Sequence, residues 1–211
     1  TSRAEGKPAS SGMIEVAARA VRGVHRTIRL KLDTTREQEE VLFRTMGLYR
    51  RAFDMSAQWG FSNHNCNKID NHKATYRAVR ELYPELQSYL VEGARDLACE
   101  ALKQLRCKKL PQRGPRSSIR YHRKAAGVYL RSGLAKLSTA DGRLKVTFRL
   151  AEYHRRYLDW TVRSSNLAFD RGLRTFFLGV VVESASPPPA APGPVLGIDR
   201  GVANIAVTSA N

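Results

Sequence analysis

The chain has 211 residues, of which 42% are hydrophobic, enough to bury a sizeable core in one or two domains. No apolar run approaches the roughly 20 residues that a membrane span needs, so we expect no membrane-spanning segment. Lysine and arginine outnumber aspartate and glutamate by 36 to 19, which gives a net charge of +17. This excess predicts a polyanionic partner. Nucleic acid is the leading candidate, and an evenly basic surface without a single target is the alternative.

The cysteine and histidine residues indicate the compartment and argue against a metal cluster. Cys66, Cys99 and Cys107 are odd in number and far apart in sequence, which predicts a reducing, cytoplasmic environment. No CxxC pair occurs, so a structural zinc ribbon is absent from this chain. His64, Cys66 and His72 match no established zinc-binding spacing, and we interpret them as polar loop residues.

The chain begins with a polar segment that leads into a strand. Its first residues, Thr1 to Gly12, are small and polar, and we predict a flexible arm over residues 1–24. From His25 to Leu32, apolar residues alternate with polar and basic ones. This alternation predicts a half-buried strand over residues 25–33.

Helical periodicity follows over residues 34–110, where we predict a bundle of three helices. Thr35 with Gln38, or Thr34 with Glu37, forms a capping box at the start of the first helix. After it, the sequence predicts a loop over Gly60–Asn71, a short helix over Lys73–Leu82 and a longer helix from Glu85 onward. The expected buried positions are Leu42, Met46, Tyr49 and Phe53 in the first helix and Leu86, Leu90, Leu97, Ala101, Leu102 and Leu105 in the third.

A basic block joins the helices to the second half of the chain. Between Lys103 and Lys124 there are nine basic residues and no acidic one. They are Lys103, Arg106, Lys108, Lys109, Arg113, Arg116, Arg120, Arg123 and Lys124. Pro111, Gly114 and Pro115 interrupt the block, so part of it is predicted to be loop. We interpret the block as a contact surface for phosphates.

Alternation with period two replaces the helical period over residues 111–183. Asp141-Gly142 predicts a hairpin turn, and Asp170-Arg171-Gly172 leads into a last strand, Arg174 to Glu183. Other alternating runs are Leu144, Val146, Phe148 and Leu150, and Leu158, Trp160 and Val162. With residues 25–33, these strands predict a small closed or nearly closed barrel in an α+β protein, and Arg143 and Lys145 lie on one basic side of it.

The last residues form a separate segment. Residues 184–194 are rich in Ser, Ala and Pro, and we predict a semi-rigid linker at a domain boundary. Residues 195–211 follow as two short apolar runs around a tight Asp199-Arg200-Gly201 turn, which predicts a hairpin with Asp199 at the end of its first strand. Asp199 either meets a metal, a donor or a cation, or supports the turn.

The motif Gly197-Ile198-Asp199-Arg200-Gly201, followed by Asn204 and Ala206-Val207, resembles the first motif of RuvC-type nuclease domains. Its form is similar to that in transposon-encoded TnpB nucleases and type V CRISPR effectors. The order of strand, inserted helices, basic turn, barrel, linker and this motif resembles the amino-terminal half of the same family. The resemblance covers residues 26 to 209, and its order is more specific than its separate motifs.

The resemblance implies a fold, an activity and partners. Residues 25–33 and 111–183 would be the wedge barrel, 34–110 the recognition lobe and 195–211 the first strands of an RNase H-like RuvC domain. A guide RNA and a target double-stranded DNA with a short adjacent motif would bind a monomer or dimer. Asp199 would bind Mg²⁺ with two further acids beyond Asn211, so this chain alone is expected not to cleave.

The resemblance and the basic segments together predict nucleic-acid contacts at several positions of this chain. Tyr76, Arg80 and Arg95 lie near positions that the family uses against the duplex motif. Phosphate contacts are expected from Lys108, Lys109, Arg113, Arg116, Arg120, Arg123, Lys124, Arg143 and Lys145. For each of these residues the alternative is an exposed basic or aromatic side chain without a partner.

Two other functional classes stay open. The chain could be a nuclease-dead, RNA-guided DNA-binding protein or repressor, or it could be a general RNA-binding barrel such as a ribosome-associated protein. Catalytic acids and CxxC pairs beyond Asn211 would favour the nuclease. A defined noncoding RNA bound on purification would exclude the general RNA binder.

Overall fold

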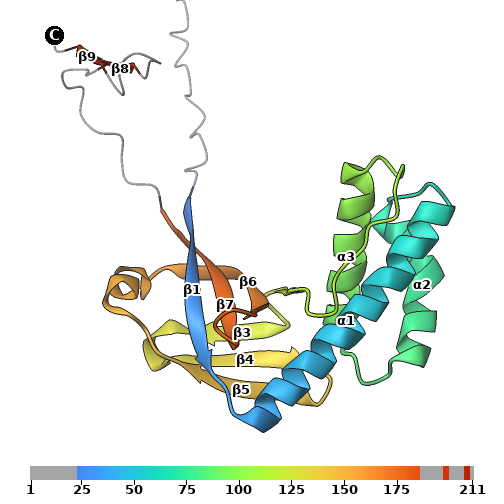
Figure 1. The fold of residues 1–211 in the computed structure, drawn as a ribbon, viewed down its shortest axis with the longest axis horizontal. Helices are drawn as coiled ribbons and strands as arrows, with labels where there is room; N and C mark the ends of the chain where they lie inside the picture. Colours follow the sequence, from blue (N-terminus) through green and yellow to red (C-terminus); the bar gives the residue numbers. More distant parts are fainter. Residues whose placement is uncertain (1–22, 186–196, 200–206, 210–211) are drawn as a thin grey trace, which may run out of the picture. The chain divides into compact units, whose positions relative to one another are not determined.

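The computed structural model describes residues 23–185, 197–199 and 207–209. Val24–Ser184 form one compact unit, and the short strands β8 (Gly197–Asp199) and β9 (Val207–Ser209) belong to a second unit, which we describe by itself. The compact unit ends where the sequence begins to be rich in Ser, Ala and Pro. Figure 1 shows its barrel and its helices.

Seven antiparallel strands form the barrel, in the order β2-β6-β7-β1-β5-β4-β3. Their bounds are β1 Val24–Asp33, β2 Ile119–Tyr121, β3 Ala126–Tyr129, β4 Leu134–Thr139, β5 Gly142–Phe148, β6 Thr161–Asp170 and β7 Thr175–Ser184. β1 pairs with β7 from Val24 to Lys31 and with β5 only at Leu32 and Asp33, so it links the two halves of the sheet. The α+β class and the small, nearly closed barrel are therefore confirmed.

Three helices are inserted between β1 and β2 and lie to one side of the barrel (Figure 1). They are α1 Arg36–Ser62, α2 Lys68–Leu82 and α3 Ser88–Gln104. The predicted capping box is present, with Thr35 accepting from the Gln38 backbone and the Gln38 side chain accepting from the Thr35 backbone. Two 3₁₀ turns, η1 (Leu130–Ser132) and η2 (Glu152–Tyr157), complete the unit. None of the helices in the described ranges has both the length and the apolar character of a membrane span.

The predicted loop over Gly60–Asn71 is mostly wrong, because α1 continues to Ser62 and α2 already starts at Lys68. The Asn-rich composition misled the prediction. Asn67 is in fact the N-cap of α2, and its side-chain oxygen accepts from the backbone N–H of Ile69 at 2.8 Å.

Strands β6 and β2 also differ from the prediction. Leu158 and Trp160 precede β6, which starts at Thr161, so only Val162 of the expected alternating run lies in a strand. The rest of β6 is rich in Ser and Asn, and β2 has three residues inside the basic block, so neither segment carries an apolar strand signal.

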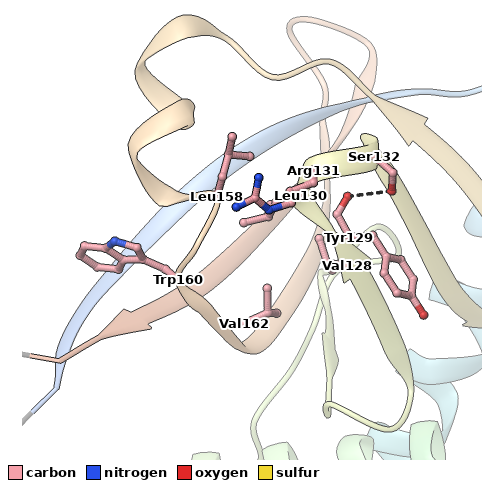
Figure 2. A pocket seen from close by; sticks show the side chains of 8 residues that line it. All are labelled: Val128, Tyr129, Leu130, Arg131, Ser132, Leu158, Trp160 and Val162. Carbon is pink, nitrogen blue, oxygen red and sulfur yellow. Dashed lines mark hydrogen bonds between the residues drawn. The ribbon is translucent and has the colours of Figure 1, made fainter.

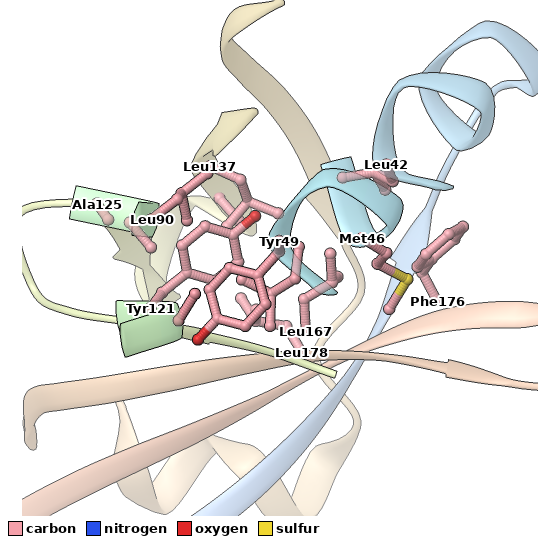
Figure 3. Packing of buried hydrophobic residues seen from close by; sticks show 14 of the residues in the cluster. Leu42, Met46, Tyr49, Leu90, Tyr121, Ala125, Leu137, Leu167, Phe176 and Leu178 are labelled. Carbon is pink, nitrogen blue, oxygen red and sulfur yellow. The ribbon is translucent and has the colours of Figure 1, made fainter. Parts of the chain in front are cut away.

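One hydrophobic core joins the helices to the barrel. Figure 3 shows side chains of α1 and α3 meeting those of the strands in a single cluster. Its labelled members are Leu42, Met46, Tyr49, Leu90, Tyr121, Ala125, Leu137, Leu167, Phe176 and Leu178. All four residues of the predicted α1 stripe are buried, whereas Leu105, expected on the α3 stripe, is the C-cap and is exposed.

The second unit contains the antiparallel pair β8 and β9. Asp199 ends β8, as predicted, and pairs with Val207 rather than with a residue next to Gly201. Arg200 and Gly201 of the expected turn are outside the described residues, so that turn stays a prediction. Residues 200–206 lie outside the described residues, as do the 1–22 segment of the expected arm and most of the linker.

Candidate nucleic-acid interface

Most of the positive charge lies in the compact unit. Residues 24–184 hold 31 of the 36 basic residues and 16 of the 19 acidic ones. Most of these acids are in ion pairs, for example Glu81 with Arg77, Asp54 with Arg50 and Asp96 with Arg95. The remaining cations therefore set the electrostatic field of this unit.

The basic block folds back along α3. Arg106 and Cys107 both have left-handed backbone conformations, with φ of 48° and 52°, and they turn the chain after the helix ends. On β2, the Arg120 Nη1 atom donates to Glu100 Oε2 of α3 at 2.6 Å. Farther on, Lys124 Nζ lies 5.8 Å from the ring centre of Tyr89, at the start of α3.

We call the nine basic residues between Lys103 and Lys124 the α3 track. α3 has 17 residues. At 1.5 Å per residue the helix is about 25 Å long, so cations placed along it could reach several successive phosphates of a nucleic acid.

Three arginines of the α3 track are held by neighbouring groups. Arg113 Nη2 donates to the Ser118 carbonyl at 2.6 Å, and burial lowers the pKa of this guanidinium. Arg116 lies over the rings of Phe43 and Phe169, at 4.7 and 5.2 Å from their centres. Arg120 is bound to Glu100.

The Arg120–Glu100 pair is part of a small charge network. Burial alone would raise the pKa of Glu100, but hydrogen bonds from Arg120 and Lys68 hold it below its ordinary value. Because Glu100 stays ionised, it offsets part of the positive charge in the middle of the track.

Free cations lie toward the two ends of the α3 track. Lys108 and Lys109 follow α3, and Arg123 and Lys124 follow β2; all four are exposed. Within the described ranges, none of these four side chains has a carboxylate within ion-pair distance. They are therefore the members of the track best placed to exchange counterions for phosphates.

A polar cleft lies between the held arginines of the track and the outer face of the barrel. Its volume is about 360 Å³. It is lined by Thr27, Leu97, Arg113, Ser118, Arg120, Ser164, Ser165, Asn166, Gly179 and Val181. Hydroxyl, amide and guanidinium groups are the usual side-chain partners of phosphate and ribose oxygens. Gly179 has no side chain, so the cleft is deeper at this position, next to Thr27 and Asn166.

The sequence did not indicate the β6 part of this cleft. Ser164 and Asn166 are separated by one residue and lie on the same face of β6, but polar alternation of this kind resembles a loop when it is read alone. Pairing of Asn166 with Gly179 and of Thr27 with Val181 brings three distant segments to this face.

The three residues expected against a duplex motif have internal partners. Arg80 donates to the carbonyls of Pro84 and Leu86 and so stabilises the turn after α2. Arg95 binds Asp96 at 2.7 Å and His72 at 2.6 Å. Tyr76 stacks near His72, with 4.5 Å between ring centres. These contacts give Arg80 and Arg95 structural roles, and their contact with DNA stays a prediction.

The two expected barrel cations differ from one another. Arg143 donates to the carbonyls of Lys124 and Ala125, so it fastens the segment before β3 to β5. Lys145 is exposed on the same strand. Of these two, Lys145 is the one available for a phosphate.

The structure does not complete a metal site. The side chain of Asp199 lies outside what the structure describes, and one carboxylate cannot hold the two ions of a RuvC centre. Within the described residues, no three His, Cys, Asp or Glu side chains are grouped so that they could hold a metal ion. The expected Mg²⁺ centre thus stays a prediction, and we derive no catalytic step from it.

Comparison with known proteins adds no relative. No family model matches the chain, and no curated protein is significantly similar to it in sequence.

Proposed function

We propose that residues 24–184 are a nucleic-acid-binding module in which the α3 track and the neighbouring polar cleft contact the phosphate backbone. The observation that carries this proposal is the placement of exposed cations, without carboxylate partners among the described residues, at both ends of a helix about 25 Å long, next to a cleft lined by Arg, Ser and Asn. A surface of this kind binds through counterion release, which requires no particular base sequence.

The finer form of the proposal is that the module is the guide-RNA-binding, amino-terminal part of an RNA-guided DNA endonuclease. Three features support it: the barrel with helices inserted after its first strand, the excess of positive charge, and the Gly-Ile-Asp-Arg-Gly motif, whose first three residues form β8. In this form, base pairing would supply specificity and the protein would bind the shape and charge of the RNA.

The salt dependence of RNA binding tests the coarser proposal. We expect Lys108→Ala with Lys109→Ala to weaken binding and to reduce the slope of log affinity against log salt by about 0.7 per lost contact for single-stranded RNA. Arg123→Ala with Lys124→Ala should act in the same way. Fluorescence anisotropy at several salt concentrations measures both quantities.

A matched control separates the α3 track from net charge. Arg36→Ala with Arg77→Ala removes the same two charges, but these arginines pair with Glu40 and Glu81 on exposed helix faces. The control should leave the salt slope close to that of the unmodified protein. Equal loss of slope in both variants would contradict the proposed surface and indicate a general charge effect.

The RNA that copurifies with the protein tests the finer proposal. A single, defined noncoding RNA is expected, whereas heterogeneous ribosomal RNA would favour the general RNA-binding barrel.

In a protein that carries the remaining acids, Asp199→Ala should abolish cleavage in Mg²⁺ and leave RNA binding intact, because it removes a metal ligand and no phosphate contact. Persistent cleavage would overturn the role of Asp199.

A further inference from the structure

The seam of the barrel contains a second pocket, which lies outside the α3 track. β2 pairs with β6 only from Ser165 to Leu167, so the first residues of β6 have a partner, β7, on one side only among the described strands. β3 pairs with β4 alone among the strands that the structure describes. The two unpaired edges face each other across this part of the seam.

We call the space between these edges the seam pocket. Its volume is about 330 Å³. Figure 2 shows Leu158 and Val162 on one side and Val128 and Leu130 on the other, with Arg131 beside Leu130 and Leu158, and the Trp160 ring pointing outward at the edge. The walls are thus mainly apolar, and one large aromatic ring lies at the edge of the pocket.

Pairs of aromatic and basic side chains lie near the seam pocket. The Trp160 ring meets Tyr157 edge-on, with 5.1 Å between centres, and Arg156 lies 5.0 Å from the centre of the Tyr157 ring. Tyr129, 49% exposed, has Lys136 Nζ at 5.2 Å from its ring centre. Rings for stacking, interspersed with cations for phosphates, are what single-stranded nucleic acids bind.

Arg131 can supply one of these cations. It pairs with Asp159 on the opposite side of the pocket, and both side chains are largely exposed, at 71% and 80%. An exposed ion pair contributes little to stability, so Arg131 can exchange Asp159 for a phosphate at small cost.

An added β-strand fits the seam less well than a base does. β3 ends where η1 begins at Leu130, and β6 has a register shift between Val162 and Ser164. A bulge of this kind interrupts the hydrogen-bond ladder that a docking strand would need. The positive charge of the unit also favours a polyanion over a peptide.

We propose that the barrel seam takes one unstacked base of a single-stranded RNA segment, with the Trp160 ring at the edge of the seam pocket as the stacking surface and Arg131 on the adjoining phosphate. This inference rests on the proposed function and adds to it a base-binding position at the barrel seam. The contact is independent of base pairing and tolerates different bases, because every base has a face that can stack.

Trp160 also provides the probe. The chain has two tryptophans, Trp59 and Trp160, so Trp59→Phe leaves Trp160 as the single reporter. Titration with a nine-nucleotide oligouridine should quench its fluorescence. An oligonucleotide with the same number of phosphates but abasic sugars should quench it far less.

Affinity measurements on variants complete the test. Trp160→Ala should weaken oligouridine binding about five-fold or more at an unchanged salt slope, and Trp160→Phe should restore most of the affinity. Leu173→Ala, which truncates an apolar side chain that is 66% exposed in the β6–β7 turn, serves as the control and should bind normally. Thermal unfolding of each variant verifies that it is folded.

The outcomes separate this inference from the proposed function. Unchanged affinity in Trp160→Ala, or equal quenching by the abasic oligonucleotide, overturns the base pocket while the α3 track still binds RNA. A change of oligomeric state in Trp160→Ala without a change in RNA affinity also overturns it, because the pocket would then be a protein contact. No RNA binding by the unmodified protein overturns both proposals.

Discussion

Asp170 shows how one carboxylate can fasten a turn and a distant strand at once. Its Oδ1 atom accepts from the backbone N–H groups of Gly172 and Leu173, both at 3.0 Å. Its Oδ2 atom accepts from Arg29 of β1 at 2.7 Å. The hydrogen bond from Leu173 and then that from Arg29 hold the pKa of Asp170 below its ordinary value.

The lowered pKa of Asp170 predicts a pH-dependent contribution to stability. A carboxylate with a depressed folded-state pKa stabilises the fold above its unfolded pKa of about 3.9, and this contribution is lost as the pH falls through the lower folded value. We expect Asp170→Asn to unfold at a lower temperature than the unmodified protein at pH 7. The difference should shrink as the pH falls below about 4, where the unfolded carboxyl becomes protonated, and should vanish below the lower folded pKa.

Thermal melts at pH 7 and pH 3 measure this difference. The asparagine side chain in this variant would still offer an oxygen to the turn, so the substitution mainly removes the charge that faces Arg29. Glu85→Gln is the control, because Glu85 is exposed and has no ion-pair partner within the described ranges. A pH-independent difference in Asp170→Asn would contradict the role of its charge.

At this scale the sequence predicted local chemistry and missed distant partners. The capping box at Thr35 and the Asp170 turn were predicted, because each is made by residues within three or four positions. The partner of Asp170, Arg29, is 141 residues away, and no local sequence pattern indicates this pairing. The same holds for Arg120 and Glu100, whose pairing reduces the number of free cations in the predicted contact surface.

At the scale of elements, α1 carries two glycines in opposite environments. A Cβ atom at Gly60 would lie 2.5 Å from Leu102 Cδ1 and 2.7 Å from the Asn65 carbonyl oxygen, whereas a Cβ atom at Gly47 would meet nothing within 4 Å. Gly60 therefore permits the close approach of α3 and of the chain between α1 and α2.

The two glycines give a matched pair of substitutions. Gly47→Ala should stabilise the protein by about 0.5–1 kcal/mol, because alanine favours the helix more than glycine does. Gly60→Ala has the same gain in helix propensity but should destabilise by about 1–3 kcal/mol, since a backbone oxygen cannot move away cheaply. Urea unfolding measures both free energies, and stabilisation by Gly60→Ala would show that the α1–α3 contact is looser than described.

The elements that the sequence missed share a physical reason. β2 and most of β6 have polar outer faces because they line the cleft, so their alternation lacks the apolar signal on which strand prediction depends. α1, α3 and the β4–β5 hairpin were predicted because each buries a regular apolar stripe. The candidate cleft could thus not be predicted from the sequence, although its arginines, Arg113 and Arg120, were predicted as phosphate contacts.

At the scale of the whole molecule, the inserted helices and the barrel belong to one compact unit. The Thr45 Oγ1 atom of α1 accepts from the backbone N–H of Ala140, between β4 and β5, at 3.0 Å. Thr45 is fully buried. A buried N–H group needs such a partner, so this bond ties the helices to the barrel beside their shared core.

This union predicts that residues 24–184 unfold in one cooperative step. In the Trp59→Phe background, the far-UV circular dichroism, which is dominated by the helices, and the fluorescence of Trp160 next to β6 should change at the same urea concentration. Thr45→Val leaves the Ala140 N–H unpaired and should lower the free energy of unfolding by about 1–3 kcal/mol in both signals equally. Thr45→Ser keeps the hydroxyl oxygen and should lower the free energy of unfolding by less.

Two separate unfolding transitions, or a Thr45→Val effect confined to the helical signal, would mean that the helices and the barrel fold independently. The cleft between them could then open without unfolding either part.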